Sequence, residues 1–255
     1  TLGNESILKL LIKFSIPAIV GMIVNMLYNV IDRIYIGNIP NIGGLAITGV
    51  GITMPLTTII TAFGMLIGIG TCANISIAYG KKNKTEAESF LGNGVALIII
   101  ISILIAILGN IFAKPLLTLF GASENTISYA VNYMNIYAIG TIFVQLTLGM
   151  NAFITAQGFA KTGMLSVLIG AVANIILDPV FIFGMNMGVR GAALATIISQ
   201  ALSCIWVLSF LFGKKTFLKI KPENLRLHAK IILPCVALGS SLFIMQASES
   251  IISVC

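Results

Sequence analysis

Two aspartates, Asp32 and Asp178, stand in segments whose other residues are almost all apolar. Asp178 lies in the stretch VANIILDPVFIFGMNMG, and Asn174 precedes it by one helical turn. A charged side chain at the centre of a bilayer costs about 2.5–3.5 kcal/mol on insertion scales, so an ionisable residue there marks a candidate functional site. Desolvation disfavours the charged form of a carboxylate, which brings proton uptake and release toward neutral pH. The same oxygens, completed by Asn and Thr oxygens, could hold a cation such as Na⁺ instead.

Other polar residues recur at helical spacing in four of the apolar segments. Residues three, four or seven positions apart share one face of a helix. Because polar groups in hydrocarbon need partners, we expect the four faces to turn toward one another around a hydrated cavity. For any single threonine, the alternative is a simple contact between helices. The four faces consist of Asn25, Asn29 and Asp32; of Thr147, Asn151 and Thr155; of Asn174 and Asp178; and of Thr196, Gln200 and Ser203.

The surroundings of the two acids favour a functional site over a closed structural network. No Lys or Arg lies within a helical turn of Asp178, and Arg33 follows Asp32 directly, so that the two point to different faces of a helix. Pro179 removes a backbone hydrogen bond and frees the carbonyl of Ile175, one turn before the acid. We therefore predict a bend beside Asp178.

The elements that hold these residues are predicted to be transmembrane helices. Hydrophobic residues make up 58% of the 255, charged residues only 9%, and the mean hydropathy is +1.05. A helix crosses the hydrocarbon core with about 20 apolar residues. Barrel strands would need a period-two alternation that the segments lack. We therefore predict an all-α polytopic membrane protein with seven spans, at roughly 10–36, 45–79, 89–113, 126–157, 163–187, 190–213 and 229–255.

The basic residues predict an orientation in the membrane. The net charge is +7, but twelve basic residues fall on one side of the predicted spans, and only Arg33, Lys114 and Arg190 fall on the other. Cytoplasmic loops carry the excess of Lys and Arg. We therefore expect a multi-pass protein of the cell inner (plasma) membrane with a cytoplasmic N-terminus, whose basic loops contact lipid head groups rather than nucleic acid.

The usual metal-binding residues follow no ligand spacing. His228, the single histidine, lies in the basic segment between the sixth and seventh spans. The four cysteines stand singly, without a C-x-x-C motif, so no metal site, disulfide framework or organic cofactor is predicted. They are Cys72, Cys204, Cys235 and Cys255.

The order of these features resembles the N-terminal lobe of the multidrug and toxic compound extrusion (MATE) transporters. Asp32 resembles the acid of the family's first helix, and Pro17 resembles its bending proline. The polar cluster around the fifth-helix acid is matched by Asn151, Asn174, Asp178 and Thr196, and the opening GAALATIISQ of the sixth helix is similar too. Glu249 resembles an acid that some members carry in the seventh helix.

The resemblance implies a domain organisation. Residues 1–213 would form a six-helix lobe, residues 214–228 a cytoplasmic basic loop, and residues 229–255 the seventh helix, which begins a C-terminal lobe that is missing here. The resemblance also implies no enzyme but a secondary active antiporter, which would export amphipathic or cationic compounds in exchange for H⁺ or Na⁺. Asp32, Asp178, Asn174, Asn151 and Thr196 would bind the coupling ion. The substrate cavity would include Asn25, Asn29, Gln200 and Glu249, and the hinges would be Pro17 and Pro179.

Three other functions fit the composition less well. A flippase for lipid-linked precursors, from the same superfamily, would favour Arg or Lys in the cavity to hold a diphosphate, and these helices have almost none. An intramembrane aspartyl protease needs Tyr-Asp and Gly-x-Gly-Asp motifs, which neither YNVID nor IILDP supplies. A structural membrane subunit without transport activity is the third alternative.

Overall fold

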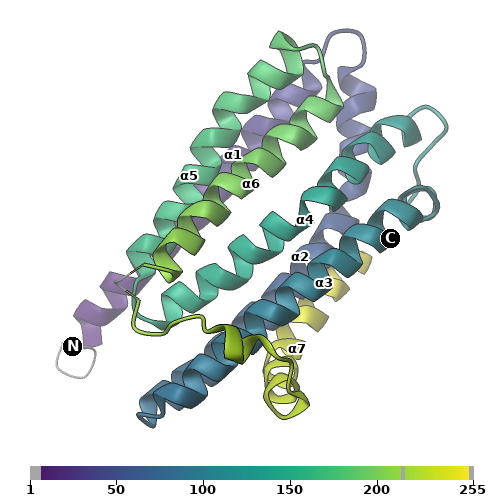
Figure 1. Ribbon diagram of the computed structural model, residues 1–255. Coiled ribbons are helices and arrows are strands. Elements are labelled where there is room, and N and C mark those ends of the chain that lie inside the picture. Colours follow the sequence, from purple (N-terminus) through teal and green to yellow (C-terminus); the bar gives the residue numbers. More distant parts are fainter. Residues whose placement is uncertain (1–6, 214–215, 253–255) are drawn as a thin grey trace.

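A computed structural model describes residues 7–213 and 216–252, and long helices make up most of this part of the chain (Figure 1). A π-helical turn, η1 (Val180–Gly184), follows α5, and a short 3-10 turn, η2 (Pro222–Leu225), precedes α7. Each long helix is apolar enough and long enough to cross a membrane, so the prediction of a multi-pass membrane protein is confirmed. The long helices are α1 (Ile7–Gly37), α2 (Gly43–Gly80), α3 (Lys84–Leu119), α4 (Ile127–Ala156), α5 (Ala160–Pro179), α6 (Val189–Leu211) and α7 (Ala229–Ile252).

Two helices differ from their predicted bounds for reasons visible in the backbone. α3 begins earlier than expected because Asn83 caps it: the side chain accepts a hydrogen bond from Glu86 N at 3.2 Å and donates one to Glu86 Oε2 at 2.9 Å. α3 also continues through Pro115 to Leu119. α5 ends at Pro179, where the chain passes into η1. The last predicted residues of the seventh span, 253–255, lie outside the described part.

Successive helices run up and down across the bundle, and α4 lies at its centre (Figure 1). α4 packs against α2, α3 and α6, while α1 packs mainly against α5. α7 packs mainly against α2. The helices α1, α5 and α6 therefore form one side of the bundle, and α2, α3 and α7 form the other.

The contact between α2 and α7 is a close approach of two backbones. A Cβ on Gly239 would collide with the carbonyl oxygen of Leu66, and a Cβ on Gly70 would collide with that of Cys235. Small residues allow such an approach between membrane helices, where lipid gives no hydrophobic force to drive association. The two glycines thus hold α7 directly against α2.

The segment between α6 and α7, described from residue 216 onward, is attached to the bundle by buried polar groups. Gln157 Oε1, at the end of α4, accepts hydrogen bonds from Thr216 Oγ1 at 2.7 Å and from the backbone nitrogens of Phe217 and Leu218 at 2.9 and 3.3 Å. Asn93 Oδ1, on α3, accepts one from His228 N at 2.8 Å. We call residues 216–228 the linker; its backbone is held by α3 and α4.

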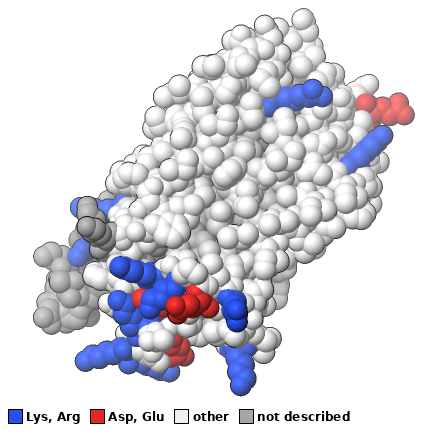
Figure 2. All heavy atoms as spheres, viewed as in Figure 1, with Lys and Arg blue, Asp and Glu red and all other residues white. Residues whose placement is uncertain are grey.

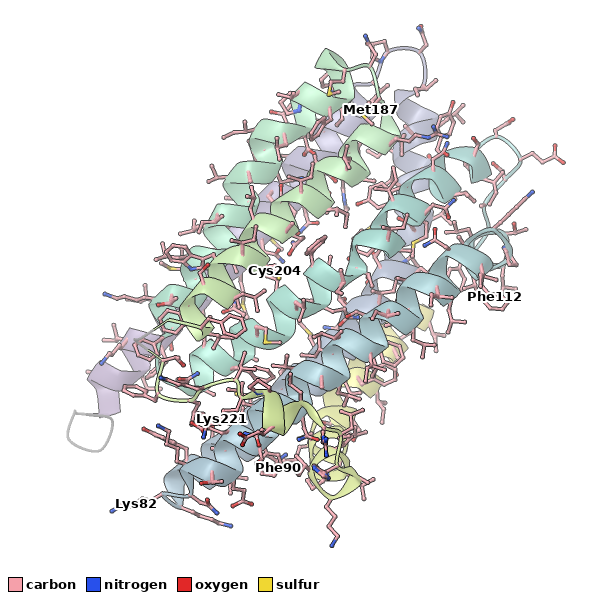
Figure 3. The ribbon with its side chains drawn as sticks, in the orientation of Figure 1. Lys82, Phe90, Phe112, Met187, Cys204 and Lys221 are labelled. Atoms are coloured by element: carbon pink, nitrogen blue, oxygen red, sulfur yellow. The ribbon has the colours of Figure 1, made fainter. Side chains whose placement is uncertain are left out.

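Charged side chains gather at the two ends of the bundle, and the surface between them is apolar (Figure 2). Most of the Lys and Arg side chains in this view lie at the end that carries the linker. Figure 3 shows Lys82 and Lys221 at this end and Met187 at the opposite one. The outer faces of α1 and α7 are the most open: Met22 and Leu233 are each 73% exposed, as suits surfaces that face lipid or another apolar partner.

Candidate functional site

A cavity of about 480 Å³ lies between α1, α2, α4 and α6. The α1 wall carries Asn25, Asn29, Asp32 and Arg33, and the α6 wall carries Thr196 and Gln200. Tyr133 and Tyr137 of α4 also line the cavity, with their rings stacked at a centroid distance of 6.1 Å. An apolar enclosure with a few converging polar groups is the usual form of a small-molecule site.

Asp32 and Asp178 come together from α1 and α5. Their carboxyl groups are close enough to interact electrostatically. Asp32 is 9% exposed and lines the cavity, whereas Asp178 is fully buried and is not among the lining residues. Asn174 Nδ2 donates a hydrogen bond to Asp178 Oδ1 at 3.2 Å. One acid therefore faces the cavity, and the other is enclosed behind it.

Several oxygens in this region accept no hydrogen bond from the described part of the chain. They are Asp32 Oδ1, Asn174 Oδ1 and Asp178 Oδ2. The two carboxyl groups lie within hydrogen-bonding reach of each other, and a hydrogen bond between them requires a proton on one of them. A buried oxygen without a partner costs about 1–3 kcal/mol, and more if it is charged. A proton or a small cation would remove that cost, so the arrangement is chemically able to bind one.

A smaller cavity of about 70 Å³ adjoins the first, and residues of all four predicted polar faces line it. Asn25 and Thr196 belong to both cavities, as does Gln200. Thr147 Oγ1 donates to the Gln200 carbonyl at 3.2 Å, and Ser203 Oγ donates to the Ser166 carbonyl at 2.8 Å. Some of these polar residues thus also join helices to one another.

The structure does not bring Asn151 to the acids. Its amide nitrogen donates to Gly163 O at 3.2 Å and to Ser166 Oγ at 3.1 Å. Ser166 precedes Asp178 by more than three turns of α5, about 18 Å of helix at 1.5 Å per residue. Asn151 does line the smaller cavity, but well away from the carboxyl pair along α5.

Glu249 also lies apart from the acids. Its side chain is exposed on α7 and lines neither cavity. α7 packs mainly on α2, whereas both acids belong to the other side of the bundle.

The two predicted hinge prolines have different surroundings. Pro17 is buried inside α1, which continues through it as one helix. Pro179 ends α5, and the chain then forms η1, in which Met185 N donates to Val180 O at 2.8 Å. Single π-helical turns are rare and occur often at functional sites. The irregular backbone therefore begins at Val180, two residues after Asp178.

Sequence reasoning missed the α2 wall of the cavity. This wall includes Thr53, Thr57 and Thr61, whose spacing of four in TMPLTTIIT was a usable signal. It also missed the position of Arg33, which lines the same cavity and donates a hydrogen bond to Met54 Sδ at 3.0 Å.

Metal-binding residues do not cluster in the part of the chain that the structure describes. Within it, no group of three or more His, Cys, Asp or Glu side chains is arranged to hold a metal ion. Cys72, Cys204 and Cys235 are free thiols, and Cys255 lies outside the described residues.

The family model described as MatE matches residues 17–180, more than half of the chain. The chain belongs to the MATE family of transporters. This confirms the resemblance seen in the sequence, and the matched segment contains both aspartates and the two prolines that were predicted to be hinges.

Curated relatives match three quarters or more of the chain and are about twice as long as the matched part. The multidrug export protein MepA of Staphylococcus haemolyticus is 28% identical over 240 residues, which are 94% of this chain and 51% of the relative. The FAD transporter of Shewanella oneidensis is 28% identical over 195 residues, or 75% of this chain and 42% of the relative. The chain thus spans about half the length of these MATE relatives.

A solved structure shares the fold. It is described as the inward-facing conformation of a multidrug resistance MATE family transporter of the MOP superfamily, and it is 26% identical to this chain with a TM-score of 0.86. The match covers 96% of this chain and 55% of the other.

Proposed function

We propose that this chain forms the N-terminal lobe of a secondary active antiporter in a cell membrane. The antiporter exports amphipathic or cationic compounds and takes up H⁺ or Na⁺ in exchange. The observation that carries this proposal is the pair of Asp32, at the cavity, and Asp178, enclosed behind it, with buried oxygens that lack partners. Relatives named as a multidrug export protein and as an FAD transporter support the transport of small molecules.

The geometry suggests how ion binding and substrate binding compete. A cationic substrate in the cavity is attracted by the Asp32 carboxylate. A proton or Na⁺ that binds between the two acids cancels negative charge at the cavity wall and weakens that attraction. Asp178 then holds the ion out of contact with the cavity, and Asn174 orients one of its oxygens. Substrate release and ion uptake are coupled in this scheme because both depend on the negative charge of Asp32.

The remaining parts of the proposal concern the whole protein. Residues 1–213 form the first lobe, residues 214–228 are a cytoplasmic loop, and α7 leads toward a second lobe, so that alternating access moves one lobe against the other. The N-terminus is cytoplasmic. Cysteines that replace Lys84 and Lys219 should resist an impermeant thiol reagent in intact cells, and ready labelling of both would contradict this orientation.

The coupling role is tested by Asp178→Asn and Asp32→Asn in the full-length protein. Each change keeps the shape and a hydrogen-bonding group but removes the titratable charge. Both variants should reach the membrane yet lose efflux driven by a proton or sodium gradient. Asp178→Asn should still bind substrate, whereas Asp32→Asn should bind a cationic substrate more weakly, because Asp32 lines the cavity. Glu124→Gln, an exposed acid between α3 and α4, is the matched control and should transport normally. Normal efflux by Asp178→Asn would show that this acid is not the coupling site.

The coupling ion is identified by measuring efflux from proteoliposomes that contain the full-length protein, with a proton gradient and a sodium gradient imposed separately.

A flippase for lipid diphosphates is less well supported, because Arg33 is the single basic side chain among the described residues that line the main cavity.

A further inference from the structure

Three threonines form a row on the α2 wall of the cavity. Thr53, Thr57 and Thr61 are spaced by four residues, so they share one face of the helix, and all three line the cavity. Thr57 and Thr61 are partly exposed to it, whereas Thr53 is 1% exposed. None of the three was among the polar residues that the sequence predicted to line a cavity.

Each hydroxyl in this row donates its only proton to a backbone carbonyl of its own helix. Thr53 donates to the carbonyl of Val50 at 2.7 Å, Thr57 to that of Met54 at 2.9 Å, and Thr61 to that of Thr58 at 2.9 Å. A threonine hydroxyl has one donor and two acceptor lone pairs. Because the donor is used, the oxygen can only accept a hydrogen bond from a ligand.

Pro55 adds a backbone acceptor to the same wall. Proline has no N–H, so the carbonyl of Gly51 loses its usual donor four residues later in the helix. Gly51 lines the cavity as well. The α2 wall therefore has acceptor oxygens at Gly51, Thr53, Thr57 and Thr61. Thr58 also lines the cavity, and its hydroxyl donates to no other residue in the described part of the chain, so it is the one hydroxyl of this wall that can still donate.

The opposite walls suit a positive charge. Asp32 contributes a carboxyl oxygen with no partner in the described part of the chain. The stacked rings of Tyr133 and Tyr137 offer aromatic faces, which attract cations. Arg33 is the exception, since its guanidinium is a donor and repels cations; one of its nitrogens already contacts Met54 Sδ.

We propose that the α2 wall selects cations that carry N–H donors, such as amidinium and protonated amine groups, over cations that carry none, and that Thr57 and Thr61 are specificity residues. This inference rests on the proposed function, because it assumes that a cationic substrate enters the cavity. Either cation displaces the water that hydrogen-bonds these oxygens. A cation with N–H groups forms new hydrogen bonds to them, whereas a quaternary cation forms none and leaves the oxygens without a donor.

The test measures equilibrium binding of two probes to the purified full-length protein. The dye DAPI has two amidinium groups with N–H donors, and tetraphenylphosphonium is a cation without donors. Thr57→Val and Thr61→Val keep the branched shape and remove one oxygen each. Thr57→Ser keeps the oxygen. Thr48→Val is the matched control, because Thr48 also donates to its own helix, at Gly44 O, but is exposed and lies outside the cavity.

Loss of one hydrogen bond to a charged group corresponds to roughly a tenfold weaker affinity. DAPI should therefore bind about tenfold more weakly to each valine variant, while tetraphenylphosphonium binds within about twofold of the unaltered protein. Thr57→Ser and Thr48→Val should bind both probes normally. An equal loss for both probes, or no loss for DAPI, would overturn this inference alone. Failure of the unaltered protein to bind either cation would overturn the proposed function and this inference together.

Discussion

Lys221 Nζ lies 2.6 Å from Glu88 Oε2, although the two residues are far apart in the sequence. The Glu88 side chain is only 4% exposed, and its other oxygen accepts a hydrogen bond from Lys219 N at 3.4 Å. The hydrogen bond to this carboxylate raises the pKa of the Lys221 amine, so the amine stays charged throughout the physiological range. Glu88 is therefore the residue on α3 that holds the basic part of the linker.

Glu88→Gln should loosen the linker. The change removes the charge that pairs with Lys221, and trypsin should then cleave the linker after its basic residues several-fold faster in detergent-solubilised protein. The exchange Glu88→Lys with Lys221→Glu restores opposite charges and should slow cleavage again. Glu124→Gln is the control for a lost acid outside the contact. Unchanged cleavage in Glu88→Gln would show that Glu88 does not hold the linker.

Gln157→Leu should lower the stability of the folded protein. Gln157 Oε1 accepts three hydrogen bonds from the linker. Leucine removes this acceptor from the backbone nitrogens of Phe217 and Leu218, while Thr216 Oγ1 can still donate to Leu218 O. The expected cost is about 1–3 kcal/mol, seen as a fall in the thermal unfolding midpoint in detergent. Thr155→Val, an exposed position two residues earlier in α4, should unfold like the unaltered protein. An unchanged midpoint for Gln157→Leu would mean that water replaces these bonds at no cost.

Gly239→Val should separate α7 from α2. The added side chain meets the carbonyl of Leu66, which cannot move without displacing α2 itself. Overpacking of this kind costs about 1–3 kcal/mol, so membrane abundance and the unfolding midpoint should both fall. Gly44→Ala is the matched control, because nothing lies within 4 Å of a Cβ there. If Gly239→Val is as stable as the control, the helices do not depend on this approach.

Arg33→Gln should tighten the binding of cations. The guanidinium lines the cavity, and its charge opposes that of a cationic substrate. Removing it should lower the dissociation constant of tetraphenylphosphonium several-fold at low salt, with a smaller effect at high salt because ions screen the repulsion. Arg33→Lys keeps the charge and should bind like the unaltered protein. Unchanged or weaker binding of tetraphenylphosphonium by Arg33→Gln would contradict the repulsion that we infer.

The sequence was sufficient to predict the seven helices and the polar residues of the α1 and α6 walls of the cavity. Apolar segments of membrane-spanning length define the helices, and residues such as Asn25, Thr196 and Gln200 reach a cavity because polar groups in lipid must find one another. Helical spacing does not say how far along a neighbouring helix a side chain reaches. Asn151 was therefore expected beside Asp178 but lies more than three turns from it.

Other features depend on contacts that no local pattern reveals. The pairing of Glu88 with Lys221 depends on where the linker crosses α3. Glu249 is exposed because α7 packs mainly on α2 rather than against α1 or α5. The role of the α2 threonines depends on where each hydroxyl proton points, which spacing cannot show.

Because α7 packs closely against α2, the set of helices that pack together includes α7, whereas the set that precedes the polar stretch ends at α6. A polar stretch after α6 invites a cut between residues 213 and 214, as in a split protein made from two co-expressed halves. Such a cut would leave α7 on the wrong fragment, because Gly70 and Gly239 fit α7 against a helix of the first fragment. To assemble, the second fragment would have to place α7 against α2 at positions where only glycine fits. A division placed after α7 would instead keep all seven helices in one piece.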